Sequence, residues 1–381
     1  MKRAYPISDN IITSLGFSTA ENLISLEKMK SGLILVSASN KFNSSFYGSL
    51  ISDEEIRNRF ELLAHQDRYT RFEQLCILSV SDALKSVDIN FRTEETLLIL
   101  STTKGNIDLL DRSKQTAIPY ERVFLWKTAE IIKDFFGLKN SPLVISNACI
   151  SGVLALIVGA RLIEKEKYKH VIVAGADILT EFVVSGFQSF KSLSTTPCKP
   201  FDKDRDGLSL GEAAGTVILS SDPDKNKIFI AGGASSNDAN HISGPSRTGE
   251  GLYLSMKSAM NEAQNKISGN IGFISTHGTA TPYNDEMETI AFNRMGFSEI
   301  PLVGLKGFWG HTLGAAGLIE SVAAYQSMNQ GIVHGTAGFE NAGVSVPVII
   351  NKEISYIKTD SCLKVASGFG GCNAALVFSK E

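Results

Sequence analysis

Cysteine is scarce in this sequence of 381 residues, and the cysteines present are not spaced as pairs. The odd set is Cys76, Cys149, Cys198, Cys362 and Cys372, with no Cys-x-x-Cys spacing among them. Neither a disulfide framework nor a zinc clip is therefore expected. Each cysteine has to be judged separately, and a small buried hydrophobic side chain is the default role.

Long runs of basic residues and long apolar stretches are also lacking. No run of five or six Lys or Arg occurs, and a formal net charge of -3 offers no field that would concentrate nucleic acid. The uncharged stretch 140–160 is broken by Pro142, Asn147 and Gly152, so a buried strand and helix explain it better than a membrane span. Residues 1–10 lack the apolar stretch of a secretory signal. We expect a cytoplasmic protein that binds neither nucleic acid nor membranes.

What the chain does contain is a regular alternation of apolar runs and helical stretches. With 43% hydrophobic and 20% charged residues, it can bury a large core. The expected strands lie at residues 97–100, 143–146, 171–174, 216–219, 228–230, 273–275 and 302–303. This pattern predicts an α/β architecture with largely parallel, doubly covered sheets. The polar segment 221–227 separates two stretches of similar make-up, which favours two halves, 1–222 and 223–381.

Cys149 is the cysteine that stands in an unusual place. In LVISNACISGVLALIVGA an apolar strand ends in a polar turn, and a helix of small residues begins. Free backbone N–H groups and the helix dipole at such a junction favour a thiolate, and the turn can expose the sulfur. A structural cysteine is the ordinary alternative for a residue of this type.

Two histidines stand at similar turns later in the chain. His277 follows an apolar strand in FISTHGTATPYND, and His311 lies between Gly310 and a helix so rich in Gly and Ala that it must pack closely. A side chain at the end of one strand can share a crevice with a side chain at the end of a neighbouring strand. Isolated core histidines would not explain why both occupy turns like that of Cys149.

Five segments together resemble the β-ketoacyl-acyl carrier protein synthases, the condensing enzymes of the thiolase superfamily that use a Cys-His-His triad. They occur in the family's order and are NACISG, PFDKDRDGLSLGEAAG, HGTATPYND, LKGFWGHTLGAAGLIE and ASGFGGCNAALVF. The resemblance runs from about Ile11 to the C-terminus. It implies a thiolase-like five-layered α-β-α-β-α fold from two similar halves, with Cys149 in the first and both histidines in the second.

The resemblance also implies the reaction. An acyl group would be transferred to Cys149 and joined to malonyl-acyl carrier protein by decarboxylative Claisen condensation, in fatty-acid or in polyketide or polyene biosynthesis. Both groups would be carried on the phosphopantetheine arm of acyl carrier protein, with no metal and no other cofactor. The expected partners are acyl carrier protein and a second subunit, in a homodimer or in a heterodimer with a ketosynthase-like chain.

Roles for single residues follow from the same resemblance. Cys149 matches the nucleophile, His277 and His311 match the two histidines, and Lys306 and Glu320 match a charged pair beside the active site. Phe369 matches a gating residue whose backbone N–H joins that of Cys149 in an oxyanion hole. The expected substrate-binding residues are Thr279, Thr281, Asp285 and Gly370.

Three positions depart from the family pattern, and the first and third of them lie near the gate and bear on the acyl group accepted. Leu208 stands where the family often has Phe, Ala213 where it has Gly, and Cys372 where it has Thr. Two alternatives stay open. A thiolase-type acyl-CoA acyltransferase also uses a nucleophilic cysteine, and a non-catalytic partner resembling a chain-length factor shares the fold but usually lacks that cysteine.

Overall fold

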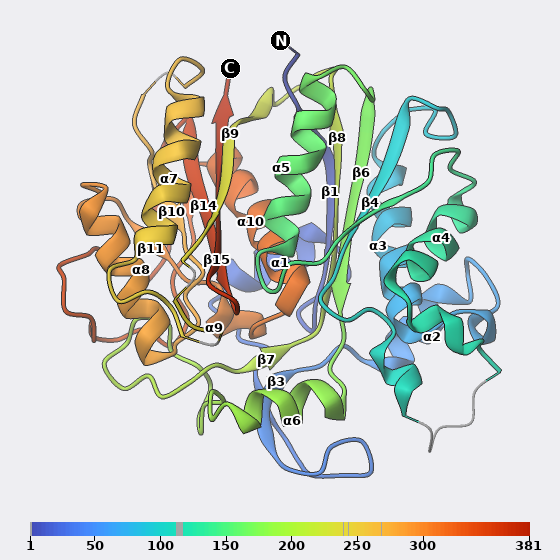
Figure 1. The fold of residues 1–381 in the computed structure, drawn as a ribbon, viewed down its shortest axis with the longest axis horizontal. Helices are drawn as coiled ribbons and strands as arrows, with labels where there is room; N and C mark the ends of the chain where they lie inside the picture. The colour runs from blue at the N-terminus through green and yellow to red at the C-terminus, as the bar shows by residue number, and fades with distance from the viewer. Residues whose placement is uncertain (1, 112–116, 239, 243, 268) are drawn as a thin grey trace.

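Two five-stranded sheets organise the chain, and helices cover both faces of each (Figure 1). The structure is a computed structural model and describes residues 2–111, 117–238, 240–242, 244–267 and 269–381. The first sheet has the order β1 (Tyr5–Ile12), β8 (Ala213–Ser220), β6 (His170–Asp177), β4 (Thr96–Ser101) and β5 (Leu143–Ile145). The second has the order β11 (Leu302–Val303), β10 (Ile274–Ser275), β14 (Ser361–Gly368), β15 (Cys372–Lys380) and β9 (Ile228–Asn237).

Every strand predicted from the apolar runs is present, but the pairing is mixed. β4 pairs in parallel with β5 and β6, whereas β8 pairs antiparallel with β6 and β1. In the second sheet β10 is parallel to β11 and β14, while β15 is antiparallel to β14 and β9. The expectation of largely parallel sheets is therefore wrong. The short turn 369–371 between β14 and β15 permits only an antiparallel hairpin, because a parallel pair needs a long crossover.

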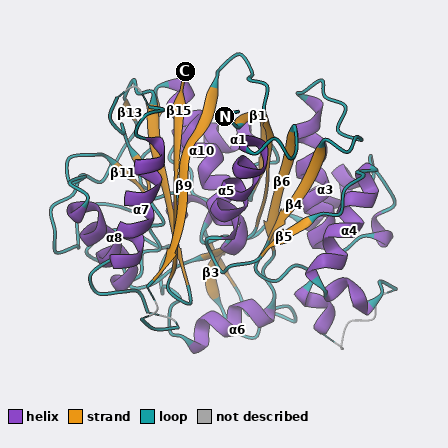
Figure 2. Cartoon of the chain, turned by 45° about the horizontal axis from the view of Figure 1, so that its top comes forward, coloured by secondary structure: helices purple, strands orange, loops and turns teal. Residues whose placement is uncertain are grey.

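The layers run in the order α-β-α-β-α (Figures 1 and 2). The outer helices of the first sheet are α3 (Arg71–Lys85) and α4 (Leu125–Phe136), and those of the second are α7 (Glu250–Ala263) and α8 (Pro282–Arg294). The central helices, α5 (Ser151–Glu164) and α10 (Ala316–Gln330), lie between the sheets. A capping box of Thr70 and Glu73 fixes where α3 begins, which aligns its apolar face with the sheet.

The remaining elements lie around these layers. A small sheet joins β2 (Ile34–Val36), β3 (Phe46–Ser49) and β7 (Leu210–Gly211), and β12 (Ile332–Val333) pairs with β13 (Ser355–Tyr356). The other helices are α1 (Thr19–Glu27), α2 (Asp53–Phe60), α6 (Glu181–Ser189) and α9 (Lys306–Trp309), together with short 3-10 turns. No helix in the described part of the chain is both long and apolar enough to cross a membrane.

Glycine explains how closely the two central helices approach. A Cβ atom added to Gly152 of α5 would lie 2.4 Å from the backbone N of Leu318 in α10. The Gly- and Ala-rich helix after His311 therefore packs against the helix after Cys149. Strands of the first sheet come from residues up to Ser220, and those of the second start at Ile228. The division into two similar halves at residue 222 stays a prediction.

Candidate active site

Cys149 lies at a sharp turn between β5 and α5. The residue before it, Ala148, has a positive φ of 43°, which turns the chain abruptly from the strand toward the helix. Ser151, the first residue of α5, stabilises this turn because its Oγ donates to the carbonyl of Ala148 at 2.6 Å and accepts from the N–H of Asn147 at 2.8 Å. The turn places the Cys149 side chain at the end of a central helix.

His311 reaches the same point from the other side. It follows Gly310, whose φ of 73° lets the chain turn after α9. The backbone N–H of His311 donates to the Ser209 carbonyl at 2.7 Å, and its carbonyl accepts from the N–H of Gly211 at 3.0 Å. The imidazole is thereby directed at the cysteine, and its Nε2 lies 3.0 Å from Cys149 Sγ.

Burial decides the protonation of this pair. It raises the pKa of the Cys149 thiol to about 12, and it lowers the pKa of His311 well below its usual range, with Lys306 as the next cause. Burial thus acts against the thiolate that the helix start favours, because desolvation disfavours the charged form of the sulfur. The resting site holds a thiol next to a neutral imidazole, which is able to accept its proton.

His277 completes the cluster. Its ring lies with its centroid 5.1 Å from that of His311, at an interplanar angle of 85°. Both oxygens of Glu288 accept backbone N–H groups from the turn that carries it, that of His277 at 2.7 Å and that of Gly278 at 2.6 Å. Burial and Lys306 lower the pKa of His277 well below its usual range, so this imidazole is also neutral.

Buried charges lie directly behind His277. Lys306 Nζ lies 3.2 Å from His277 Nδ1 and 2.7 Å from Glu320 Oε1. An ammonium can only donate, so Nδ1 accepts and the imidazole proton resides on Nε2. The other carboxylate oxygen of Glu320 accepts from Lys364 Nζ at 2.6 Å. These charges are fully buried, with exposures of at most 1%.

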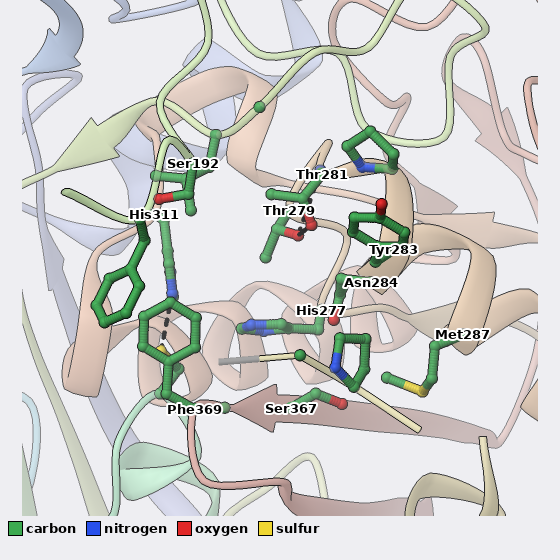
Figure 3. A pocket seen from close by; sticks show the side chains of 18 of the residues that line it. Ser192, His277, Thr279, Thr281, Tyr283, Asn284, Met287, His311, Ser367 and Phe369 are labelled. Atoms are coloured by element: carbon green, nitrogen blue, oxygen red, sulfur yellow. Dashed lines mark hydrogen bonds between the residues drawn. The ribbon is translucent and has the colours of Figure 1, made fainter. Parts of the chain in front are cut away.

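Cys149, His277 and His311 line a pocket of about 320 Å³, in which Figure 3 labels the two histidines. Thr279, Thr281 and Tyr283 line one wall, and Phe369 lines another. The ligand atoms of Cys149 and the two histidines lie within 4.8 Å of one another, a spacing that a metal ion could also use. We expect catalysis without a metal, because the ammonium of Lys306 stands directly behind His277 and repels a divalent cation.

Comparison with known proteins shows which family this arrangement belongs to. The model of the β-ketoacyl synthase N-terminal domain matches residues 37–225, and that of the C-terminal domain matches residues 228–340. The chain belongs to the β-ketoacyl synthase family. It is 31% identical to 3-oxoacyl-[acyl-carrier-protein] synthase 2 of Vibrio cholerae over 64% of this chain and 63% of that protein. It is 27% identical to a putative mitochondrial 3-oxoacyl-[acyl-carrier-protein] synthase of Schizosaccharomyces pombe, over 100% and 99% of the two chains.

Solved structures confirm the expected thiolase-like fold. The ketosynthase ApeO, determined in complex with its chain length factor ApeC from Xenorhabdus doucetiae, superposes with a TM-score of 0.86 at 23% identity over 100% of this chain and 98% of that chain. The ishigamide ketosynthase/chain length factor gives a TM-score of 0.87 at 21% identity over 100% and 99%. The predicted class, a condensing enzyme of the acyltransferase type, is confirmed by the family match.

The synthase structure brings some of the expected site residues together and leaves others apart. Cys149, both histidines and Phe369 line the pocket, as do Thr279 and Thr281. Asp285 does not line it: this carboxylate is buried under the turn and accepts from the N–H groups of Thr279 at 3.0 Å and Phe201 at 2.7 Å. Gly370 also lies outside the lining residues, and its N–H donates to the carbonyl of Ile242 at 2.7 Å.

The glycine-rich turn of the synthase lies against Cys149. A Cβ atom added to Gly368 would be 3.0 Å from the backbone N of Cys149 and 2.9 Å from Cys372 Sγ. Phe369 stacks on Phe187 with ring centroids 5.7 Å apart and meets Phe190 edge-on at 5.2 Å. The turn thus places an aromatic side chain over the pocket and a backbone beside Cys149.

Several residues of the site were not singled out from the sequence. Lys364 is the clearest, and its signal was a lysine within the apolar strand SCLKVASG. Glu288 stands one helical turn after Asp285, where it could have been noticed as a second acidic residue on the same face of α8. Phe187 and Phe190 belong to a half-exposed helix and the residue after it, and nothing in their spacing distinguishes them from core residues.

Proposed function

We propose that this synthase condenses an acyl group with malonyl-acyl carrier protein, with Cys149 as nucleophile and His277 and His311 as donors to the enolate. The observation that carries the proposal is the 3.0 Å approach of His311 Nε2 to Cys149 Sγ, with the neutral His277 beside them in one pocket. The triad geometry supplies a nucleophile, a base and two hydrogen-bond donors in one place.

Acyl transfer comes first. Cys149 Sγ attacks the thioester carbonyl, and the bond from that carbon to the pantetheine sulfur breaks. The thiol proton passes to His311 Nε2 and then to the departing pantetheine sulfur, so no proton is gained or lost. The neutral state of His311 is required for this step, because a charged imidazolium could not accept the proton.

Decarboxylation follows at the acyl-enzyme. The carbon–carbon bond to the malonyl carboxylate breaks, carbon dioxide leaves, and negative charge develops on the thioester oxygen. The Nε2–H of His277 stabilises that charge. His311 adds a second donor once its neutral ring, whose bare Nε2 was the base in acyl transfer, has lost the proton on Nδ1 to solvent and gained one on Nε2. Loss of one such donor costs about 3 kcal/mol of barrier in enzymes generally. The enolate carbon then attacks the acyl carbonyl, and Cys149 departs as a thiolate that takes up one proton from solvent.

The substrate carrier is proposed to be acyl carrier protein. Thr279 Oγ1 and Thr281 Oγ1 lie 2.9 Å apart on the pocket wall, where hydroxyl groups suit the amides of a pantetheine arm. The curated relatives are named as acyl-carrier-protein synthases, which supports this carrier. Support for a second subunit comes from ketosynthase ApeO, whose structure was determined in complex with a chain length factor. A cytoplasmic location stays a prediction.

Mass spectrometry and carbon dioxide release together test the function. The chain is incubated with acyl-acyl carrier proteins of different length, the acyl mass on Cys149 is measured, and malonyl-acyl carrier protein is then added. We expect an acyl adduct, release of carbon dioxide and a β-ketoacyl product. Thiolysis of acetoacetyl-CoA without any condensation would instead contradict the synthase and favour the thiolase alternative, and no adduct with any carrier would favour the non-catalytic partner.

A further inference from the structure

Lys364 is a second buried lysine beside the active site, and the family resemblance gave it no role. It lies on β14 with an exposure of 0%. Its Nζ donates to Glu320 Oε2 at 2.6 Å and to the Thr276 carbonyl at 2.7 Å. Lys364 therefore joins α10 to the strand end that carries His277.

Lys306 and Lys364 contact different atoms around His277. Lys306 contacts Oε1 of Glu320 and the carbonyl of His277, whereas Lys364 contacts Oε2 and the carbonyl of Thr276. Together they occupy both oxygens of one carboxylate and two consecutive carbonyls of one turn. With Oε2 occupied, the Glu320 carboxylate has one orientation, and only Oε1 faces Lys306.

The charge balance of this cluster argues against a purely stabilising role. Two ammonium groups share one carboxylate, Glu320, and the next carboxyl that faces them is Glu288, whose pKa burial and Asp285 raise to about 7. Burial lowers the pKa of Lys364, because desolvation disfavours the charged ammonium. An apolar side chain at position 364 would leave one balanced ion pair, Lys306 with Glu320, but Glu320 Oε2 and the Thr276 carbonyl would lose the donor that Lys364 supplies.

We propose that Lys364 is a positioning residue for decarboxylation, which acts through Glu320 and Lys306 to keep the proton of His277 on Nε2. This proposal rests on the proposed function. If Oε2 loses its donor, Glu320 can rotate and bind Lys306 with both oxygens, which draws Nζ away from His277 Nδ1. The Nδ1–H tautomer would then become accessible, and that tautomer has no hydrogen to donate from Nε2 to the enolate.

The decisive variant is Lys364→Met, which keeps the length of the side chain and removes its donors. We expect the rate of carbon dioxide release at saturating malonyl-acyl carrier protein to fall about 10- to 100-fold, the range for losing a charged hydrogen bond. Acylation of Cys149 is expected to stay within about threefold of the parent, because Lys364 contacts neither Cys149 nor His311. Lys364→Gln, which retains N–H donors without charge, is expected to recover part of the rate.

Two readouts separate positioning from a general effect on structure. Nitrogen-15 spectra of labelled histidine distinguish the tautomers, and we expect the His277 signals to change in Lys364→Met while those of His311 do not. In a double-mutant cycle, Lys364→Met combined with Glu320→Gln is expected to be no slower than Glu320→Gln alone. Cys362→Ala is the matched control, since Cys362 is equally buried and lies two residues away on the same face of β14.

The outcomes distinguish this proposal from the proposed function. If the parent enzyme releases no carbon dioxide from malonyl-acyl carrier protein, the proposed function is wrong and this role falls with it. If the parent does so and folded Lys364→Met matches it in rate and in the His277 spectrum, Lys364 has no positioning role. Equal losses in Lys364→Met and Cys362→Ala, or an additive double-mutant cycle, would also overturn the proposal. If Lys364→Met does not fold, Lys364→Gln decides by the same rate and spectrum.

Discussion

Cys149 Sγ and His311 Nε2 lie 3.0 Å apart, although 162 residues separate them in the sequence. The contact depends on the crossing of α5 and α10, since each residue lies just before one of these helices. Because burial keeps both groups uncharged at rest, their contact is a hydrogen bond and not an ion pair. In the proposed reaction Cys149 is therefore activated by transfer of its proton to His311 during the attack.

Cys149→Ala should abolish formation of the acyl-enzyme. We expect acyl transfer from carrier protein to fall by at least about 1,000-fold, since the variant has no nucleophile to form the covalent intermediate. The acyl adduct is measured by mass spectrometry. Cys372→Ala is the control, because Cys372 is buried beside the same turn and should leave acylation within about threefold of the parent. An adduct that survives in Cys149→Ala and disappears in Cys372→Ala would reverse the assignment.

The sequence alone points to the three residues of the triad because each stands at the same kind of turn. Cys149, His277 and His311 each follow an apolar run and precede a Gly-rich or helical segment, and the structure brings all three into one pocket. The protonation of Cys149 was not predictable in this way. A helix start is visible in a sequence, but the burial that raises the thiol pKa depends on packing between segments far apart in the chain.

Asp285 and Lys364 show the same limit for charged residues. Asp285 lies in the family motif, yet its carboxylate accepts backbone N–H groups beneath the turn and does not face the pocket. Lys364 lies outside the motif, and only the tertiary structure places its Nζ against Glu320. The pairing direction of β14 and β15 was missed for a similar reason, because the apolar runs specify strands but not their neighbours.

Gly152→Ala should destabilise the protein and weaken the contact of Cys149 with His311. The added methyl group would meet the backbone N of Leu318 at 2.4 Å, and backbone cannot move aside as a side chain does. We expect a loss of about 1–3 kcal/mol in the free energy of unfolding, measured by chemical denaturation, with slower acylation. Gly186→Ala is the matched control on α6. Nothing lies within 4 Å of its added Cβ, so this substitution should stabilise the protein by up to about 1 kcal/mol.

Phe187 and Phe190 should differ in how much they restrain the ring of Phe369. Phe187 is 8% exposed and Phe190 is 52% exposed, although both contact Phe369. Phe187→Ala should cost about 3–5 kcal/mol in the free energy of unfolding, and Phe190→Ala only about 0.5–1.5 kcal/mol. Because Phe190→Ala frees one side of the Phe369 ring, we expect its acylation rates to change with acyl chain length. An unchanged chain-length profile would show that the contact of Phe190 with Phe369 does not affect which acyl chains are accepted.

His334 should make the stability of the protein depend on pH. Its side chain is 2% exposed, and neither ring nitrogen has a hydrogen-bond partner within the described part of the chain. Burial lowers its pKa from 6.5 to about 4. Above about pH 6.5 the imidazole is neutral in the folded and the unfolded chain, so it adds no pH dependence there. Between about pH 6.5 and 4 the unfolded chain binds a proton that the folded chain resists, and stability falls as the pH falls.

His334→Leu removes this proton-linked term and should therefore lose less stability in acid than the parent. We expect the free energy of unfolding of the variant, relative to the parent, to rise by up to about 3 kcal/mol between pH 7.5 and pH 4, at about 1.4 kcal/mol per unit of pKa shift. Chemical denaturation of both proteins at several pH values measures the difference, in which the contributions of the other histidines cancel. The value at pH 7.5 isolates the packing effect of leucine. A difference that stays constant over this range would mean that solvent or a polar group reaches the imidazole, and that its pKa is not lowered.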